Sequence, residues 1–289
     1  MIPESRRRNW GTALKSYHTY AAMEGIPDEE RFPITTFKLS FFIASQLGLV
    51  RLDSLKAKIA ALKDAITALQ AGWLVDEDML RIWYSSFKNC QPHPKLARPP
   101  FLGQHAKKLI LHVKNLSKNF TDPFHVCMLA LTLIGFTGVL RSGEFTLSKL
   151  DPSLEEKKKK AKVSDLKSYS NGANGLHLPW DKANRWSGRD VAFFEFGLET
   201  SSFLRRHLFL SSLDGADILW QYHAGQGRKK GSRVFVTKSS WDNWISERLK
   251  ELNEPPMKGH SIRIGGATQL LLNGIDPKIV MKAGGWSSE

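Results

Sequence analysis

The segment from Cys90 to Pro100 constrains the fold of this chain most, because it places four prolines within eleven residues. Proline lacks a backbone donor and fixes φ, so such a segment discourages both helix and interior strand. We therefore predict a linker over 91–101, between a smaller domain over 1–90 and a larger one over 102–289. A length of 289 residues leaves room for two such domains, each with its own apolar core.

The smaller part has a helical pattern. Apolar residues recur at three- and four-residue steps from Leu55 to Leu69, and Asp53 stands ahead of them as a candidate N-cap. Two further helices are predicted, over 9–23 and over 35–47. The sequence therefore predicts a small domain of three or four packed helices.

The larger part combines helices with a short hairpin. The apolar run 126–140 is interrupted by Gly and Thr and is too short to span a bilayer, so it predicts a buried core helix. Two alternating stretches, 175–180 and 190–196, flank a turn-rich segment and predict a β-hairpin. The remaining predicted elements are helices over 103–116 and 123–133 and a helical remainder, with a helix stop at Asn273-Gly274 and the next start at Asp276-Pro277. The predicted class is mainly α with a small antiparallel sheet.

The chain is strongly basic, with 42 Lys and Arg against 28 Asp and Glu and a net charge of +14. An excess spread along the whole chain favours an extended polyanion such as nucleic acid, because released phosphate counterions drive such binding. A basic soluble protein without a polyanion partner is the alternative. The run Lys157–Lys160 predicts a solvated loop, with a nuclear-import signal or a phosphate contact as alternatives.

Two cysteines, Cys90 and Cys127, are too few for a disulfide framework or a metal knuckle. We therefore expect an intracellular protein without a bound metal. No apolar stretch follows the basic N-terminus, so no signal peptide is predicted.

Two segments carry arginines in a pattern that suggests chemistry. In 137–147, Arg141 and Glu144 are three residues apart, a spacing that lets the carboxylate hold the guanidinium. In 259–268, His260 and Arg263 have the same spacing on one predicted helix. Taken singly, the first pair is more often an ordinary surface ion pair, and a lone histidine is more often structural than catalytic.

A third segment, 283–288, sets Trp286 directly after a glycine pair that ends a predicted helix. The order of these features carries a resemblance. An Arg box, a lysine in a hairpin turn, an H-x-x-R helix and a Trp at 26 residues beyond that histidine make the region 107–289 similar to the catalytic domain of tyrosine recombinases, the phage integrase family. The phrases 178–182 and 284–289 look most like recombinases of eukaryotic DIRS-type and Crypton-type mobile elements.

The resemblance implies a role for each matching residue. Arg141 and Arg263 would hold the non-bridging oxygens of a scissile DNA phosphate, with Glu144 as support. His260 would lie against the phosphate and help manage the nucleophile's proton, and Trp286 would donate its ring N–H to a phosphate oxygen.

The general acid for the leaving 5′-oxygen would be the lysine of the hairpin turn. Lys182 is the predicted residue, and Lys162 and Lys167 stay open as alternatives because they also lie between the boxes. Arg185 and Arg189, in the same turn, are predicted to contact backbone phosphate.

The sequence departs from the family in one respect. The family's nucleophilic tyrosine is expected eight or nine residues after the Trp286 position, whereas the five tyrosines here all precede His260. We therefore expect either an incomplete sequence or a decayed copy, inactive as written.

The resemblance implies a helical core-binding domain with a SAM-like fold, followed by a catalytic domain of the DNA breaking-rejoining type. The implied function is site-specific recombination or integration of a mobile element through a 3′-phosphotyrosine intermediate. The alternatives are a non-catalytic DNA-binding protein derived from a recombinase and a type IB topoisomerase-like enzyme. Double-stranded DNA is the expected partner, with a synaptic tetramer on DNA, no cofactor and no membrane, and a nuclear location if the source is eukaryotic.

Overall fold

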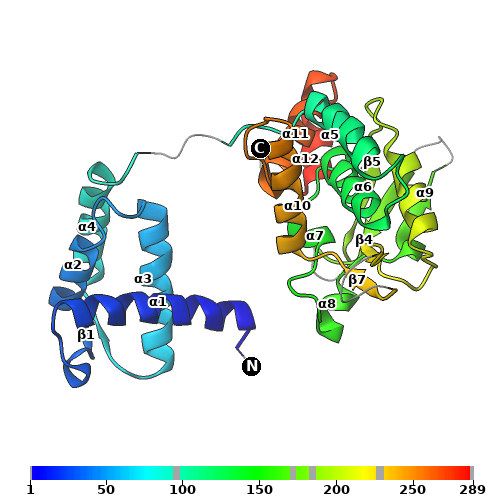
Figure 1. Cartoon of the computed structure of the whole chain (residues 1–289). Coiled ribbons are helices and arrows are strands. Elements are labelled where there is room, and N and C mark those ends of the chain that lie inside the picture. The colour runs from blue at the N-terminus through cyan, green and yellow to red at the C-terminus, as the bar shows by residue number, and fades with distance from the viewer. Residues whose placement is uncertain (1, 94–97, 170–173, 182–186, 226–230, 287–289) are drawn as a thin grey trace. The chain divides into compact units, whose positions relative to one another are not determined.

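The computed structural model describes residues 2–93, 98–169, 174–181, 187–225 and 231–286 of the chain. The chain divides into two compact units, Met1–Leu96 and Ala97–Glu289. The division falls within the proline-rich segment, and each unit is described by itself below (Figure 1).

Unit 1 is helical, with one short parallel strand pair. Its main elements are α1 (Glu4–Met23), α2 (Thr36–Ala44), α3 (Leu52–Ala68), α4 (Glu77–Asn89), the 3₁₀ turn η1 (Asp28–Glu30) and the strands β1 (Ile34–Thr35) and β2 (Trp73–Leu74).

The core of unit 1 forms where the apolar face of α3 packs against α1. Leu55, Ile59 and Leu62 of α3 are fully or almost fully buried, as the helical spacing predicts. Tyr17 of α1 is buried in the same cluster. The prediction of Asp53 as the N-cap is wrong: α3 begins at Leu52, so Asp53 lies in the first helical turn. There its charge still favours the helix N-terminus.

Unit 2 holds the longer part of the chain, with helices around a buried central helix. Its helices are α5 (Gly103–Leu116), α6 (Pro123–Thr137), α7 (Ser142–Phe145), α8 (Leu154–Lys158), α9 (Thr200–Leu210), α10 (Lys238–Glu251), α11 (Gly259–Leu272) and α12 (Pro277–Gly284), with the 3₁₀ turn η2 (Val163–Asp165). Its strands are β3 (Leu166–Ser168), β4 (Asn174–Leu178), β5 (Arg189–Phe193), β6 (Gln221–His223) and β7 (Arg233–Phe235).

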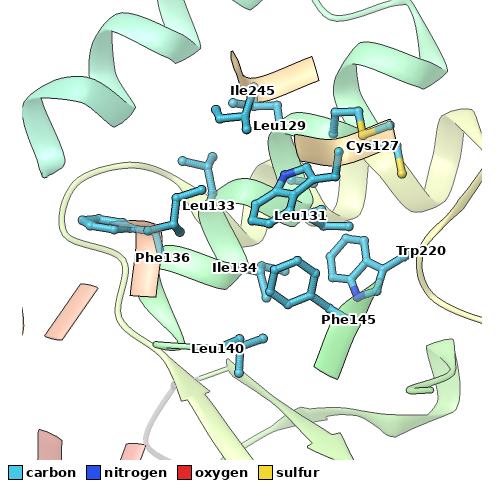
Figure 2. Close-up of a cluster of buried hydrophobic side chains, with 14 of the residues drawn as sticks. Cys127, Leu129, Leu131, Leu133, Ile134, Phe136, Leu140, Phe145, Trp220 and Ile245 are labelled. Atoms are coloured by element: carbon cyan, nitrogen blue, oxygen red, sulfur yellow. The ribbon is translucent and has the colours of Figure 1, made fainter. Parts of the chain in front are cut away.

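Helix α6 is the centre of unit 2. Every residue from Val126 to Thr137 is buried, because the helix is apolar on all sides and other elements cover each of its faces. Figure 2 shows Leu131 and Ile134 of this helix in a cluster with Phe145 of α7, Trp220 just before β6 and Ile245 of α10. The prediction of a buried core helix is confirmed. The helix continues to Thr137, beyond the predicted end at 133.

Two glycines let α11 approach its neighbours closely. A Cβ on Gly265 would lie 1.8 Å from the carbonyl oxygen of Phe101, and one on Gly266 would lie 2.1 Å from that of Phe136. Both distances are far below contact, so only glycine fits at either position. This packing sets α11, which carries His260 and Arg263, directly against the end of α6.

The predicted hairpin is present as β4 and β5, paired antiparallel with Leu176 opposite Val191. Strand β3 extends it to a three-stranded antiparallel sheet. The expectation that the rest of the chain is helical is wrong, because β6 and β7 form a second antiparallel pair within it. None of the helices in the described ranges could cross a membrane, since none is both long and apolar enough.

Candidate functional site

A cavity of about 200 Å³ opens in unit 2 beside the first turns of α7, α10 and α11. Its lining is dominated by cationic side chains, with five Lys and Arg against one Asp. Such a balance favours an anion of small size. The lining residues are Arg98, Arg141, Ser142, Lys238, Asp242, Lys258, Gly259, His260 and Arg263.

Arg141 stands immediately before α7, and Glu144 fixes its position. One carboxylate oxygen of Glu144 accepts from the Arg141 backbone N–H at 2.8 Å, and the other accepts from its guanidinium at 2.9 Å. Glu144 is buried, whereas the Arg141 side chain is 29% exposed. The carboxylate therefore caps the helix and leaves part of the guanidinium facing the cavity.

Arg263 lies one turn into α11 and is almost fully buried. It donates to the carbonyl of Val139 at 2.8 Å and to the carbonyl of Gly284. Burial, and after it the repulsion of the neighbouring Arg141 cation, lowers the pKa of Arg263 to about 10. The side chain remains protonated at neutral pH, so the cavity keeps a permanent charge on this wall.

The indole ring of Trp286 packs against the guanidinium of Arg263. The guanidinium carbon lies 4.3 Å from the centre of the indole ring, a cation–π contact. A Cβ on Gly284 would lie 1.9 Å from this ring, so the glycine is what allows the ring to fold back on α12. Trp286 is 39% exposed and does not itself line the cavity. It contacts the cavity through Arg263, on which it packs.

The C-terminus of α12 holds three arginines with three consecutive carbonyls. Ala283 accepts from Arg189 at 2.6 Å, Gly284 accepts from Arg263, and Gly285 accepts from Arg141 at 3.0 Å. The last carbonyls of a helix lack intrahelical partners and carry the negative end of its dipole. Gly285 takes the left-handed conformation, with φ of +60°, which ends the helix at this point.

His260 is exposed and lines the cavity one turn before Arg263. The structure thus brings Arg141, His260 and Arg263 to one cavity from two segments that lie more than 100 residues apart in sequence. The resemblance implies that these three side chains lie close together, because all three would contact one phosphate.

Lys182 and Arg185 lie outside the described residues. Of the two alternatives for the general acid, Lys167 forms an ion pair with Asp190 at 2.8 Å, and Lys162 is exposed. Neither lines the cavity.

Arg189 begins β5 and is only 12% exposed. Besides Ala283, its guanidinium contacts the buried carboxylates of Glu144 and Asp181, each at 3.2 Å. The structure therefore places Arg189 among protein acceptors. Its predicted phosphate contact remains a prediction.

Lys160 departs from the solvated loop predicted for Lys157–Lys160. It is buried behind α7, where its ammonium donates to the carbonyl of Gly143 at 2.5 Å. Burial lowers the pKa of Lys160 to about 8, although Glu156 and Glu144 oppose the shift. The other end of the run, Lys157 and Lys158, lies in α8.

Four further cavity residues were not singled out from the sequence: Arg98, Lys238, Asp242 and Lys258. Lys258 had a signal, because it lies two residues before His260, directly ahead of the motif 259–268. Arg98 lies in the proline-rich segment and Lys238 at the start of α10, where nothing in the local pattern points to a site. One carboxylate oxygen of Asp242 is buried without a hydrogen bond.

The five tyrosines of the chain all lie in described segments, and none of them lines the cavity. Tyr17, Tyr20 and Tyr84 belong to unit 1, and Tyr222 packs on the core of unit 2. Across the described ranges, no group of three or more His, Cys, Asp or Glu is placed to hold a metal ion.

No family model and no curated protein matches this sequence. Solved structures do match its fold. The XerH site-specific recombinase bound to palindromic difH substrate aligns with 97% of this chain and 73% of its own, with 17% identity and a TM-score of 0.60. The Tn1549 transposon integrase in complex with transposon right end DNA aligns with 99% and 87%, with 15% identity and a TM-score of 0.60.

A lambda integrase dimer bound to a COC′ core site aligns with 100% of this chain and 70% of its own, with 14% identity and a TM-score of 0.54. These alignments extend over both units. They confirm the predicted mainly α class with small sheets. The chain has the fold of the tyrosine recombinases and integrases.

Proposed function

We propose that this protein binds double-stranded DNA and that its cavity holds one backbone phosphate for strand cleavage and rejoining, as in a site-specific recombinase or integrase. The observation that carries the proposal is the convergence of Arg141, His260 and Arg263 on one strongly cationic cavity. The same cavity belongs to a fold shared with the three solved structures named above, each of which was determined with DNA.

The chemistry follows from the two guanidiniums. A phosphodiester undergoing in-line displacement develops charge on its non-bridging oxygens, and fixed donors aimed at those oxygens lower the barrier. Arg141 and Arg263 are held by backbone carbonyls and by Glu144, so little reorganisation is needed when a phosphate arrives. His260 faces the cavity and supplies a group that can accept or donate the nucleophile's proton.

Lys182 remains the proposed general acid. Its described neighbour Asp181 is buried and lies 3.2 Å from Arg189, which also pairs with Glu144. In any form of the protein that cleaves DNA, Lys182→Ala should abolish cleavage, and sulfur in place of the bridging leaving oxygen should restore it. Rescue of Lys162→Ala or Lys167→Ala instead would assign the acid to that residue.

Non-catalytic DNA binding is the second candidate function. The observation that favours it is that none of the five tyrosines lines the cavity. The lining residues can hold a phosphate, but they include no phenol to attack it.

Two further parts of the proposal concern the setting. The proposal includes a tetramer on DNA; the solved lambda integrase, a dimer on its core site, supports the coarser statement that copies associate on DNA. An intracellular location, nuclear in a eukaryote, follows from a DNA partner.

The first experiment measures binding of a random-sequence 30-base-pair duplex by fluorescence anisotropy. Affinity should fall steeply between about 50 and 200 mM salt, since several phosphate contacts release counterions. Weak binding that is insensitive to salt would refute DNA as the partner.

The second experiment asks whether a nucleophile within the 289 residues reaches the bound phosphate. Nicked random-sequence duplexes trap a covalent intermediate, which a denaturing gel resolves from free protein. The 289-residue protein should bind these duplexes without forming an adduct. An adduct would show that a nucleophile within the chain reaches the phosphate.

A further inference from the structure

We infer that Arg189 is a positioning residue, which holds Arg141 and Glu144 in the geometry that a DNA phosphate requires. The inference rests on the proposed function, because the phosphate is the ligand that Arg141 would meet. It assigns to Arg189 a role through other residues, distinct from a direct phosphate contact.

The contacts of Arg189 join three parts of unit 2. Its Nη1 donates to Ala283 at the end of α12, its Nη2 donates to Glu144 in α7, and its Nε lies 3.2 Å from Asp181. The Glu144 oxygen that accepts from Arg189 is the one that accepts from the Arg141 backbone at 2.8 Å. Arg189 and Arg141 therefore share one acceptor atom of Glu144.

The same two residues are also joined through α12. Arg189 binds the carbonyl of Ala283 and Arg141 binds that of Gly285, two residues further along. Arg263 binds Gly284 between them. A shift of this helix end would move the acceptors of Arg141 and Arg263 together.

The charge balance gives Arg189 a second effect on the site. The cluster of Arg141, Arg189, Arg263, Glu144 and Asp181 has three positive and two negative charges, a net of +1. Without Arg189 the net charge would be zero. Glu144 and Asp181 are buried, so their charges would then draw more strongly on Arg141.

A lysine cannot replace this arrangement. One planar guanidinium donates to Ala283 and Glu144 through its two terminal nitrogens, while its Nε lies 3.2 Å from Asp181 as an ion pair without a hydrogen bond. An ammonium keeps the charge but reaches one or two of these acceptors. Arg189→Lys therefore separates positioning from charge alone, because a residue that acted only by its charge would tolerate the change.

The test uses phenylglyoxal, which modifies arginines, with the rate at each residue read by peptide mass spectrometry. In Arg189→Lys without DNA, Arg141 should react roughly tenfold faster than in the wild type, the lower end of what a lost charge-assisted hydrogen bond allows. Arg248 is the internal standard, because its side chain is 11% exposed and paired with Glu251 elsewhere in unit 2.

Arg233→Lys is the matched control variant, since Arg233 also bridges an aspartate and a backbone carbonyl but lies outside the cavity lining. In that variant the rate at Arg141 should equal the wild-type rate. Asp181→Asn keeps Arg189 and removes one of its partners, so it should raise the Arg141 rate by a smaller factor. It also provides the test if Arg189→Lys fails to fold.

An unchanged Arg141 rate in folded Arg189→Lys, or in Asp181→Asn where that variant carries the test, would overturn the inference. An equal rise at Arg141 and Arg248 would also overturn it, because that pattern reports general loosening of the unit. The proposed function is tested separately, by adding a random-sequence duplex to the wild type. If the duplex does not protect Arg141, DNA binding at this cavity fails, whereas the rates without DNA still decide the role of Arg189.

Discussion

Replacing Glu144 with glutamine tests the electrostatic basis of the site. The substitution keeps the shape of the side chain and removes its charge. Glu144 is 2% exposed and accepts three hydrogen bonds, from the backbone and guanidinium of Arg141 and from Arg189. In the variant, two guanidiniums lose their shared counter-charge, and the amide group turns a donor toward one of them.

The expected cost follows from burial. Removing one partner of a buried ion pair costs about 3–5 kcal/mol, and the partial exposure of Arg141 places Glu144→Gln at the lower end, about 3 kcal/mol. Unit 2 extends from Ala97 to Glu289, which is 193 residues because 289 − 96 = 193. For a unit of that size each kcal/mol lowers Tm by about 2–4 °C, so a decrease of about 6–12 °C is expected.

Scanning calorimetry of the whole protein measures this decrease. Glu247→Gln is the matched control, because Glu247 also pairs with an arginine but is 67% exposed. An exposed pair contributes about 1 kcal/mol or less, so this variant should stay close to the wild type. A Glu144→Gln variant as stable as Glu247→Gln would refute the claim that Glu144 holds the arginines by its charge.

Three further predictions concern the core and the cavity. The pKa of Lys160 is lowered from 10.5 to about 8 in the folded protein, so below pH 8 the buried ammonium lowers the free energy of unfolding by its full amount. This loss disappears as pH rises toward 10.5, because the folded protein releases the proton first. Urea unfolding should therefore show the wild type gaining up to roughly 3 kcal/mol relative to Lys160→Met across that window, and a constant difference would disprove the shift. Gly266→Ala should lower the free energy of unfolding by about 3 kcal/mol, since its Cβ would lie 2.1 Å from the Phe136 carbonyl; a loss under about 1 kcal/mol would contradict that contact. Arg141→Ala and Arg263→Ala should each weaken binding of a random-sequence duplex roughly tenfold in anisotropy assays. Unchanged affinity would contradict the proposal that DNA binds at this cavity.

Local sequence signals predicted many of the helices. The helix over 103–116 has the predicted bounds, and the start at Asp276-Pro277 is confirmed, with Asp276 capping α12. Such features depend on neighbouring residues alone, through apolar spacing, capping oxygens and proline at the first helical position. The order of the boxes, which periodicity does not interpret, carried the resemblance and with it the predicted site residues.

Features that depend on distant partners were missed. Strands β6 and β7 are three residues each and pair across a segment with no clear alternation, so their pairing is settled by packing in unit 2. At the candidate site, Arg141 and Glu144 could be paired from their spacing. The carbonyls of Ala283, Gly284 and Gly285 could not be foreseen as acceptors, because a backbone carbonyl has no signature in the sequence.

The central claim is that Arg141 and Arg263 hold one backbone phosphate in the cavity. A crystal structure of the protein with a duplex tests it most directly. We predict a phosphate whose non-bridging oxygens lie within about 2.7–3.2 Å of both guanidiniums, with His260 beside it. A duplex bound to the protein with no phosphate in that cavity would contradict the account.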